Sequence, residues 1–357
     1  MNDSITQKIV GIMLLLFSIT LLIPLIVSFL YSDGNHFTFI YSLITILVLG
    51  GLLYFPNRNA ASDIKTKEGF LIVVLFWVVL SLVGSIPFML DKQLSLSFID
   101  AFFESVSGWT TTGATIITNL DSLSPSILIY RQELQWLGGM GIVILALAVL
   151  PMLGVGGMQL YKAESTGPIK DNKISPRIAE TAQSLWSIYL GLTIACAVLY
   201  YVAGMTAFDA IAHSLSTVAG GGFSTHDKSI GFFDSGLIEA VCIIFMLLSA
   251  ASFAVHYAAI FGGKPLRYFY DSEFRFFLTV VMSIVLITLI FHTISNSYAD
   301  ILLTLRASIF HTVSIVTTSG FTTENFSLWP SFLPYLLLVG AFMGACSQSV
   351  GGGIKTW

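Results

Sequence analysis

Charged side chains are scarce in this sequence. Asp, Glu, Lys and Arg together make up 10% of the 357 residues, whereas a soluble domain contains about 25%. Hydrophobic residues account for 55%, and the mean hydropathy is +0.85. This composition excludes an ordinary soluble protein and predicts a polytopic membrane protein.

Cysteine is rare as well. Cys196, Cys242 and Cys346 lie in apolar stretches without paired spacing, which argues against a disulfide framework or a zinc site. The sequence also lacks a phosphate-binding glycine loop, a nucleophile elbow and a His/Asp/Glu cluster with metal-ligand spacing. We therefore expect a protein that is not an enzyme.

A short polar motif, in contrast, occurs three times, at 107–115 (SGWTTTGAT), 216–224 (STVAGGGFS) and 314–322 (SIVTTSGFT). Aligning the last glycine of each copy places Ser107, Ser216 and Ser314 six residues upstream, and Glu104, His213 and His311 nine residues upstream. The aligned glycines, Gly113, Gly222 and Gly320, are 109 and 98 residues apart. A repeat of that length is a whole structural unit rather than one turn of a solenoid.

Hydrophobic runs of roughly 20 residues predict the membrane spans. They cover 9–30, 38–55, 69–90, 129–153, 182–203, 236–261, 274–294 and 330–349. The first run is too long for a signal-peptide core and lacks a small-residue cleavage site, so we expect it to be retained. Shorter apolar pieces precede each motif, at 98–106, 208–215 and 302–313. They suit re-entrant half-helices, which enter the membrane, stop at the glycine loop and return.

The predicted fold is therefore an all-α polytopic membrane protein built from repeats of span, pore loop and span. The expected segments are an N-terminal two-span segment at 1–68 and three pore repeats at 69–181, 182–272 and 273–357. On this topology 12 of the 16 basic residues lie on the side opposite the motifs. The positive-inside rule then places the N-terminus in the cytoplasm and the motifs toward the outside.

The motif residues suggest an ion-selectivity filter. A dehydrated monovalent cation needs a ring of oxygen dipoles in place of its water, and backbone carbonyls can supply it. Glycine lets the backbone adopt the conformations that aim successive carbonyls at one axis. The candidate K⁺ ligands are Thr111, Thr112, Gly113, Gly220, Gly221, Gly222, Thr318, Ser319 and Gly320. The alternative is that these small residues simply permit close helix packing.

Two further features of the sequence each allow two interpretations. Glu104, His213 and His311 are ionisable groups on the half-helices, where they either orient the filter by hydrogen bonding or, for the histidines, carry protons. The cluster Gly351, Gly352 and Gly353 should break the last span, and it forms either a gate in the pore or an ordinary loop.

Several longer motifs carry a family resemblance. They are FESVSG at 103–108 with TTTG at 110–113, QWLGGMG at 135–141, LPMLGVGGMQL at 150–160, GGFSTHD at 221–227 and GGGIK at 351–355. With these motifs the chain resembles the membrane subunit of the bacterial Trk/Ktr potassium uptake systems, and it is most similar to the TrkH type.

The resemblance implies four fused pore repeats around one K⁺ pathway in the bacterial inner membrane, with the motif carbonyls as ion ligands. It also implies a gate at Gly351–Gly353, a membrane homodimer and a cytosolic nucleotide-binding regulatory subunit of the TrkA-like kind. Gated conduction and K⁺ symport with H⁺ or Na⁺ are both compatible with the sequence.

Three of the four repeats are found here, because the sequence stops at Trp357; we expect a chain truncated before the fourth. Two rival functions remain open at this point. One is a non-conducting fragment that associates with a full-length partner. The other is a secondary carrier for another solute, which binds its substrate at helix breaks near the midplane.

Overall fold

The computed structural model describes residues 3–60, 66–141, 178–264, 266–295, 297–298, 300–330 and 332–355. Within these ranges the regular structure is helical, without strands, which confirms the predicted all-α fold. The described residues form two compact units. The first contains 3–60, 66–110, 114–141 and 178–186, and the second contains 111–113 together with the residues from 187 onward.

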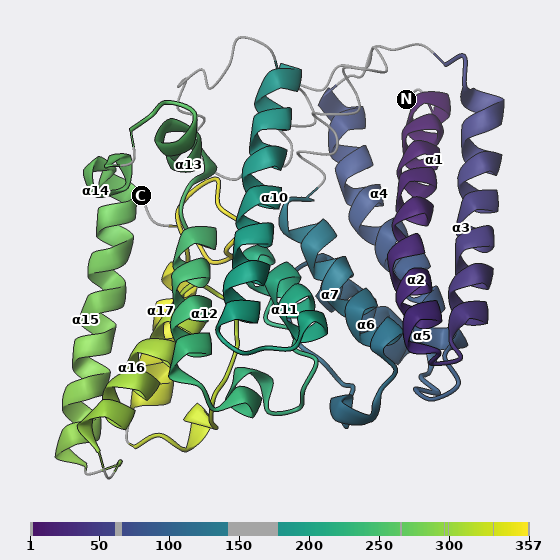
Figure 1. Cartoon of the computed structure of the whole chain (residues 1–357). Helices are drawn as coiled ribbons and strands as arrows, with labels where there is room; N and C mark the ends of the chain where they lie inside the picture. The colour runs from purple at the N-terminus through teal and green to yellow at the C-terminus, as the bar shows by residue number, and fades with distance from the viewer. Residues whose placement is uncertain are drawn as a thin grey trace. The chain divides into compact units, whose positions relative to one another are not determined.

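Helices α1 (Asp3–Thr20), α2 (Leu22–Tyr31), α3 (His36–Asn57), α4 (Thr66–Gly84), α5 (Ile86–Leu90), α6 (Phe98–Trp109) and α7 (Pro125–Gly139) form the first unit, with the short 3₁₀ helix η1 (Leu120–Ser122). Helix α1 packs along α3 and also against α4, while α6 lies between α4 and α7 (Figure 1). Trp109 at the end of α6 contacts the rings of Phe17 and Phe76 edge-on. This aromatic core joins the N-terminal segment to the first half-helix.

The second unit is built around two more half-helices. Its elements are most of α10 (Ile178–Val202), then α11 (Ala207–Ala219), η2 (Ser229–Phe233), α12 (Gly236–Ser249), α13 (Phe253–Ile260), α14 (Arg267–Tyr270), α15 (Ser272–Ile294), α16 (Ile301–Val316), η3 (Phe326–Leu328) and α17 (Leu333–Met343). Helix α11 packs against α12, and α16 packs against α12, α15 and α17 (Figure 1).

Five helical stretches of the described chain are long and apolar enough to cross a membrane. They are Ser4–Tyr31, His36–Asn57, Glu68–Leu90, Gln183–Val202 and Ser272–Ile294, and each corresponds to a predicted span. The predicted span 129–153 continues beyond Gly141, where the described residues end. The two remaining spans differ from the prediction.

The predicted span 236–261 is not one continuous helix, because α12 and α13 meet at an angle of 102°. The Ala250 carbonyl accepts the Cys346 N–H at 3.1 Å, and the Ala254 N–H, its partner in an unbroken helix, donates to the Ser252 hydroxyl at 3.3 Å. A serine in this position caps a new helix. The bend is therefore held by hydrogen bonds to the segment after α17, which local hydropathy does not reveal.

The last predicted span, 330–349, is helical only over Leu333–Met343. Gly344 follows with φ +70°, and a Cβ there would lie 2.3 Å from the Gly352 oxygen. Glycine is required at this position by both the left-handed backbone and the close approach. The chain then continues as a non-helical loop that returns toward the end of the helix.

Capping side chains begin all three half-helices. Ser97 accepts the Asp100 N–H at 3.2 Å at the start of α6, and Thr206 accepts the Asp209 N–H at 3.1 Å at the start of α11. Asp300 caps α16, which begins earlier relative to its motif than the other two. These caps fix where each half-helix starts, and the motifs fix where it ends.

Asp33, in the turn between α2 and α3, ties the N-terminal segment to the first repeat. Its carboxylate accepts the Ser126 N–H at the start of α7 at 3.0 Å, the Ser28 hydroxyl at 2.5 Å and the Asn35 N–H at 3.0 Å. Burial raises the pKa of this carboxyl, but these hydrogen bonds outweigh burial and leave the pKa below its usual value.

We expect Asp33→Ala to lower the free energy of unfolding by about 1–2 kcal/mol, because α7 loses its cap. Since the folded pKa is depressed, this stabilisation is complete above the unfolded pKa of about 3.9 and disappears as the pH falls through the folded value. Thermal unfolding in detergent at several pH values measures both effects. Equal melting temperatures for the two proteins at neutral pH would contradict the assignment.

Candidate ion-binding site

The three motif loops share one backbone conformation. In each loop the aligned glycine and the residue two positions before it have positive φ, with a residue between them that does not. The angles are +53° and +74° at Thr111 and Gly113, +67° and +77° at Gly220 and Gly222, and +62° and +81° at Thr318 and Gly320. Positive φ at every second position departs from strand geometry and is typical of backbone that approaches a ligand closely. K⁺ filters are built from backbone carbonyls held in such non-strand conformations.

Two of the left-handed residues are threonines. A β-branched residue with positive φ is a genuine outlier, and such conformations cost roughly 1–3 kcal/mol and persist only where the surroundings impose them. Thr111 and Thr318 occupy equivalent places in the first and third loops. Such strained positions favour a functional role for the loops over that of simple connections.

The second and third half-helices end in the same hydrogen-bond pattern. Gly220 and Gly221 donate to the carbonyls of Thr217 and Ser216, at 3.1 and 3.0 Å. At the equivalent places Thr318 donates to Ile315 at 3.0 Å, and Ser319 to Ser314 at 2.9 Å. This pair of bonds is the Schellman arrangement, which turns the chain at a helix C-terminus. Each turn leaves the loop beside the negative end of a helix dipole, where a cation is stabilised.

Glu104 holds the first loop from behind. Its carboxylate accepts the Thr115 hydroxyl at 2.9 Å and the Ile116 N–H at 3.3 Å, both in the segment that leaves the loop. Arg131 on α7 forms an ion pair with it at 2.8 Å and also donates to Thr115 at 3.0 Å. The side chains of both ionic partners are 0% exposed.

His213 occupies the equivalent place behind the second loop. Its Nδ1 lies 2.9 Å from the Asp209 carbonyl, and its Nε2 lies 2.9 Å from the Ser224 hydroxyl. Because a carbonyl only accepts, Nδ1 carries the hydrogen. The ring thus links its own half-helix to the segment that leaves the loop.

His311 repeats this arrangement behind the third loop. Its Nδ1 lies 3.1 Å from the Ala307 carbonyl, and its Nε2 accepts the Thr323 N–H at 3.4 Å. An amide N–H only donates, so Nε2 has no hydrogen and the ring is neutral. The geometry favours the orienting role for Glu104, His213 and His311 over proton carriage, because both ring nitrogens of each histidine are engaged.

The second and third loops touch one another. A Cβ added to Gly222 would lie 1.9 Å from the Ser319 oxygen, so only glycine allows this approach. Thr111, Thr112 and Gly113 belong to the same compact unit as these two loops, although the other described residues of the first repeat lie in the other unit. The structure therefore groups all nine predicted ligand residues in one unit.

The predicted gate loop lies against this group. The Gly352 N–H donates to the Thr318 hydroxyl at 2.6 Å, and a Cβ on Gly351 would lie 3.0 Å from the Thr317 oxygen. Gly220 approaches Val350 from the second loop. The Lys355 ammonium turns back and donates to the carbonyls of Gly351 and Ser349.

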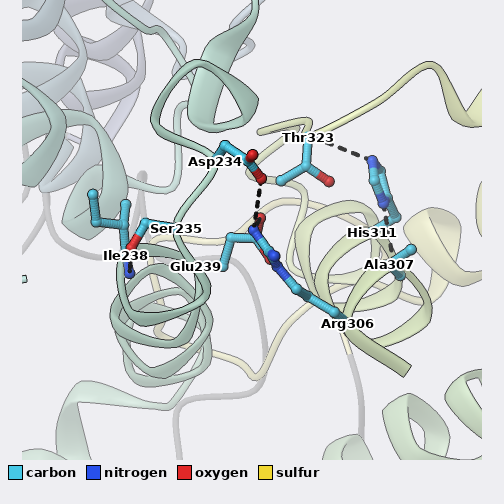
Figure 2. A network of polar contacts seen from close by, with 8 residues as sticks. All are labelled: Asp234, Ser235, Ile238, Glu239, Arg306, Ala307, His311 and Thr323. Carbon is cyan, nitrogen blue, oxygen red and sulfur yellow. Dashed lines mark hydrogen bonds and ion pairs between the residues drawn. The ribbon is translucent and has the colours of Figure 1, made fainter. Parts of the chain in front are cut away.

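Figure 2 shows a second ionic contact, between α16 and α12. Arg306 donates to both carboxylate oxygens of Glu239, through Nε at 2.6 Å and Nη2 at 2.8 Å, and it lies 3.5 Å from Asp234. The sequence motifs predicted no role for Arg131 or Arg306. Their position within apolar segments is a signal for such ion pairs, because a charge there needs a partner.

Part of the sequence pattern lies outside the described residues. This applies to the motif at 150–160 and to the basic residues Lys162, Lys170, Lys173 and Arg177. The expectations based on them remain predictions.

The Glu104–Arg131 pair predicts a non-additive effect on stability. Removing one partner of a buried ion pair costs about 3–5 kcal/mol, because the other charge stays buried and unpaired, whereas replacing both by apolar groups is far less costly. We expect Glu104→Leu to destabilise the protein more than Glu104→Leu/Arg131→Met. Thermal unfolding in detergent compares the two. A double variant that melts below the single variant would argue against the pair.

Comparison with known proteins agrees with this geometry. The TrkH family, described as "Cation transport protein", matches residues 35–357. The chain is 52% identical over 350 residues to the Trk system potassium uptake protein TrkH of Vibrio parahaemolyticus, covering 98% of this chain and 72% of that protein. It is 51% identical over 348 residues to TrkH of Escherichia coli K12, with the same coverage.

A more distant relative and a solved structure agree. The E. coli protein TrkG is 39% identical over 359 residues, covering 100% of this chain and 74% of that protein. The crystal structure of the potassium transporter TrkH from V. parahaemolyticus superposes with a TM-score of 0.89 at 48% identity, over 99% of this chain and 73% of that chain. The chain therefore belongs to the TrkH family of cation transport proteins and is a multi-pass membrane protein.

Proposed function

We propose that this chain takes up K⁺ across the bacterial inner membrane. The observation that carries the proposal is the shared alternation of positive φ in three loops, each of which follows a capped half-helix. Relatives at 51–52% identity are potassium uptake proteins, which supports K⁺ as the transported ion. In this proposal the ion ligands are backbone carbonyls of Thr111–Gly113, Gly220–Gly222 and Thr318–Gly320.

The loop at Gly351–Gly353 is proposed as the gate. It contacts the third ligand segment through Thr318 and the second through Gly220. Lys355 donates to the carbonyl of Gly351 in this loop and to that of Ser349 just before it, so a cation of the protein occupies oxygens that would otherwise attract a K⁺ ion. A loop in this position obstructs the path just beyond the ligands.

The assembly is proposed from the resemblance. Relatives are named as components of a Trk system, which supports a partner subunit. We infer a cytosolic nucleotide-binding regulator, a homodimer embedded in lipid and a cytoplasmic N-terminus. Lys264 and Arg267 lie between α13 and α15, and Arg275 lies in the first turn of α15, as the positive-inside rule expects next to a cytoplasmic loop.

The ligand assignment predicts that Gly222→Ala abolishes K⁺-dependent growth. The added Cβ would collide with the Ser319 oxygen at a residue with φ +77°, so the two segments must separate. Growth at low external K⁺, in a bacterium without its own K⁺ uptake systems, measures this effect once membrane insertion is verified. The matched control is Gly191→Ala, because a Cβ at Gly191 meets nothing within 4 Å. If Gly222→Ala restored growth as well as the control does, this result would contradict the ligand assignment.

The gate assignment predicts a different phenotype for Gly351→Val. A Cβ at this glycine already lies 2.5 Å from the Ala345 Cβ, so valine should displace the loop from the ligand segments. We expect faster K⁺ flux into vesicles with an unchanged preference for K⁺ over Na⁺. Slower flux from correctly inserted protein would show that the loop is structural.

A further inference from the structure

The ion pair between Arg306 and Glu239 joins two consecutive repeats. Glu239 lies in the first turn of α12, after the second loop, and Arg306 lies in α16, before the third loop. The guanidinium uses two nitrogens on the two carboxylate oxygens, at 2.6 and 2.8 Å. The Glu239 side chain is 5% exposed and that of Arg306 29%, so the contact is largely shielded from solvent.

This geometry fixes both distance and orientation. A planar guanidinium binds a carboxylate through two parallel hydrogen bonds, whereas a lysine ammonium acts as a point charge. The pair differs in this respect from Glu104–Arg131, which holds together parts of a single repeat. Asp234 also faces the guanidinium at 3.5 Å, but its side chain is 92% exposed.

Backbone contacts continue the connection toward the ion ligands. The Gly231 N–H donates to the Thr322 carbonyl at 3.1 Å, and the Thr322 N–H donates to the Ser229 hydroxyl at 3.2 Å. Residues after the second loop thus bind the segment that leaves the third. The contact between Gly222 and Ser319 lies between these bonds and the half-helix ends.

His311 relates Arg306 to the third loop. Figure 2 shows it on α16 beyond Arg306, with hydrogen bonds to Ala307 on one side and Thr323 on the other. A shift of α16 relative to α12 would therefore move the third ligand segment relative to the second. The only charged pair that sets this relative position among the described residues of the two helices is Arg306–Glu239.

We propose that Arg306 and Glu239 are positioning residues that set the ion preference by fixing the separation of the second and third ligand segments. Neither residue touches the ion. The proposal rests on the proposed function, because it assumes that these segments select K⁺. It assigns to the pair a role in specificity in addition to any contribution to stability.

The test is the ratio of K⁺ to Na⁺ uptake into vesicles, normalised to inserted protein. We expect Arg306→Gln and Glu239→Gln each to lower the ratio by roughly two- to thirty-fold, the range for residues that act through a packed network. The double variant should resemble the single variants, because the three share one lost interaction. Arg306→Lys keeps the charge but loses the paired hydrogen bonds, so it should also lower the ratio.

The control is Lys228→Gln, which removes one positive charge from an exposed position in the segment between α11 and η2 and should leave the ratio unchanged. An unaltered ratio in every Arg306 and Glu239 variant, with only less protein or lower melting temperature, would overturn the proposal. If the single variants do not insert, the double variant provides the test, because it leaves neither Arg306 nor Glu239 as an unpaired charge, and Asp234 is exposed to solvent.

Measuring Gly222→Ala in the same assay distinguishes a failure of this inference from a failure of the ligand assignment. If it changes the ratio and the Arg306 and Glu239 variants do not, this inference fails and the ligand assignment stands. If Gly222→Ala also leaves the ratio unchanged, the ligand assignment itself fails.

Discussion

Backbone polar groups inside a membrane must find partners within the protein, and this constraint organises the whole structure. Hydrocarbon offers no hydrogen bonds, so irregular backbone is tolerated only where protein or a water-filled path satisfies it. The N–H groups that follow α11 and α16 donate to carbonyls in the last turns of these helices. His213 and His311 form hydrogen bonds with the segments that leave the loops. At the bend between α12 and α13, backbone groups form hydrogen bonds with N–H and C=O groups of the segment after α17.

The sequence predicted the elements whose causes are local. The three half-helices end within the aligned motifs, because the residues that stop each helix there also adopt positive φ. The residues nine positions before each glycine could be predicted to lie behind the loops, since half-helix and loop are consecutive. The bend at Ala250–Ser252 could not, because its hydrogen bonds come from a distant segment. The partner of Arg306 was missed for the same reason.

The three repeats reach one geometry with different chemistry. A carboxylate with a buried arginine holds the first loop, and imidazole rings hold the second and third. Threonine takes the first left-handed position in two loops and glycine takes it in the other. Beyond the aligned serine and the last glycine, the repeats therefore share backbone conformation more than residue identity.

The glycine at the first left-handed position of the second loop has a consequence for how such a protein can evolve. In an assembly of identical subunits, a substitution in one loop alters the same loop in every subunit at once. Here Gly220 replaces the threonine of the other two loops in one place only, so a single mutation alters one loop and leaves the other two unchanged. A chain with fused repeats thus allows each loop to be adjusted separately, and it allows the loops to differ from one another.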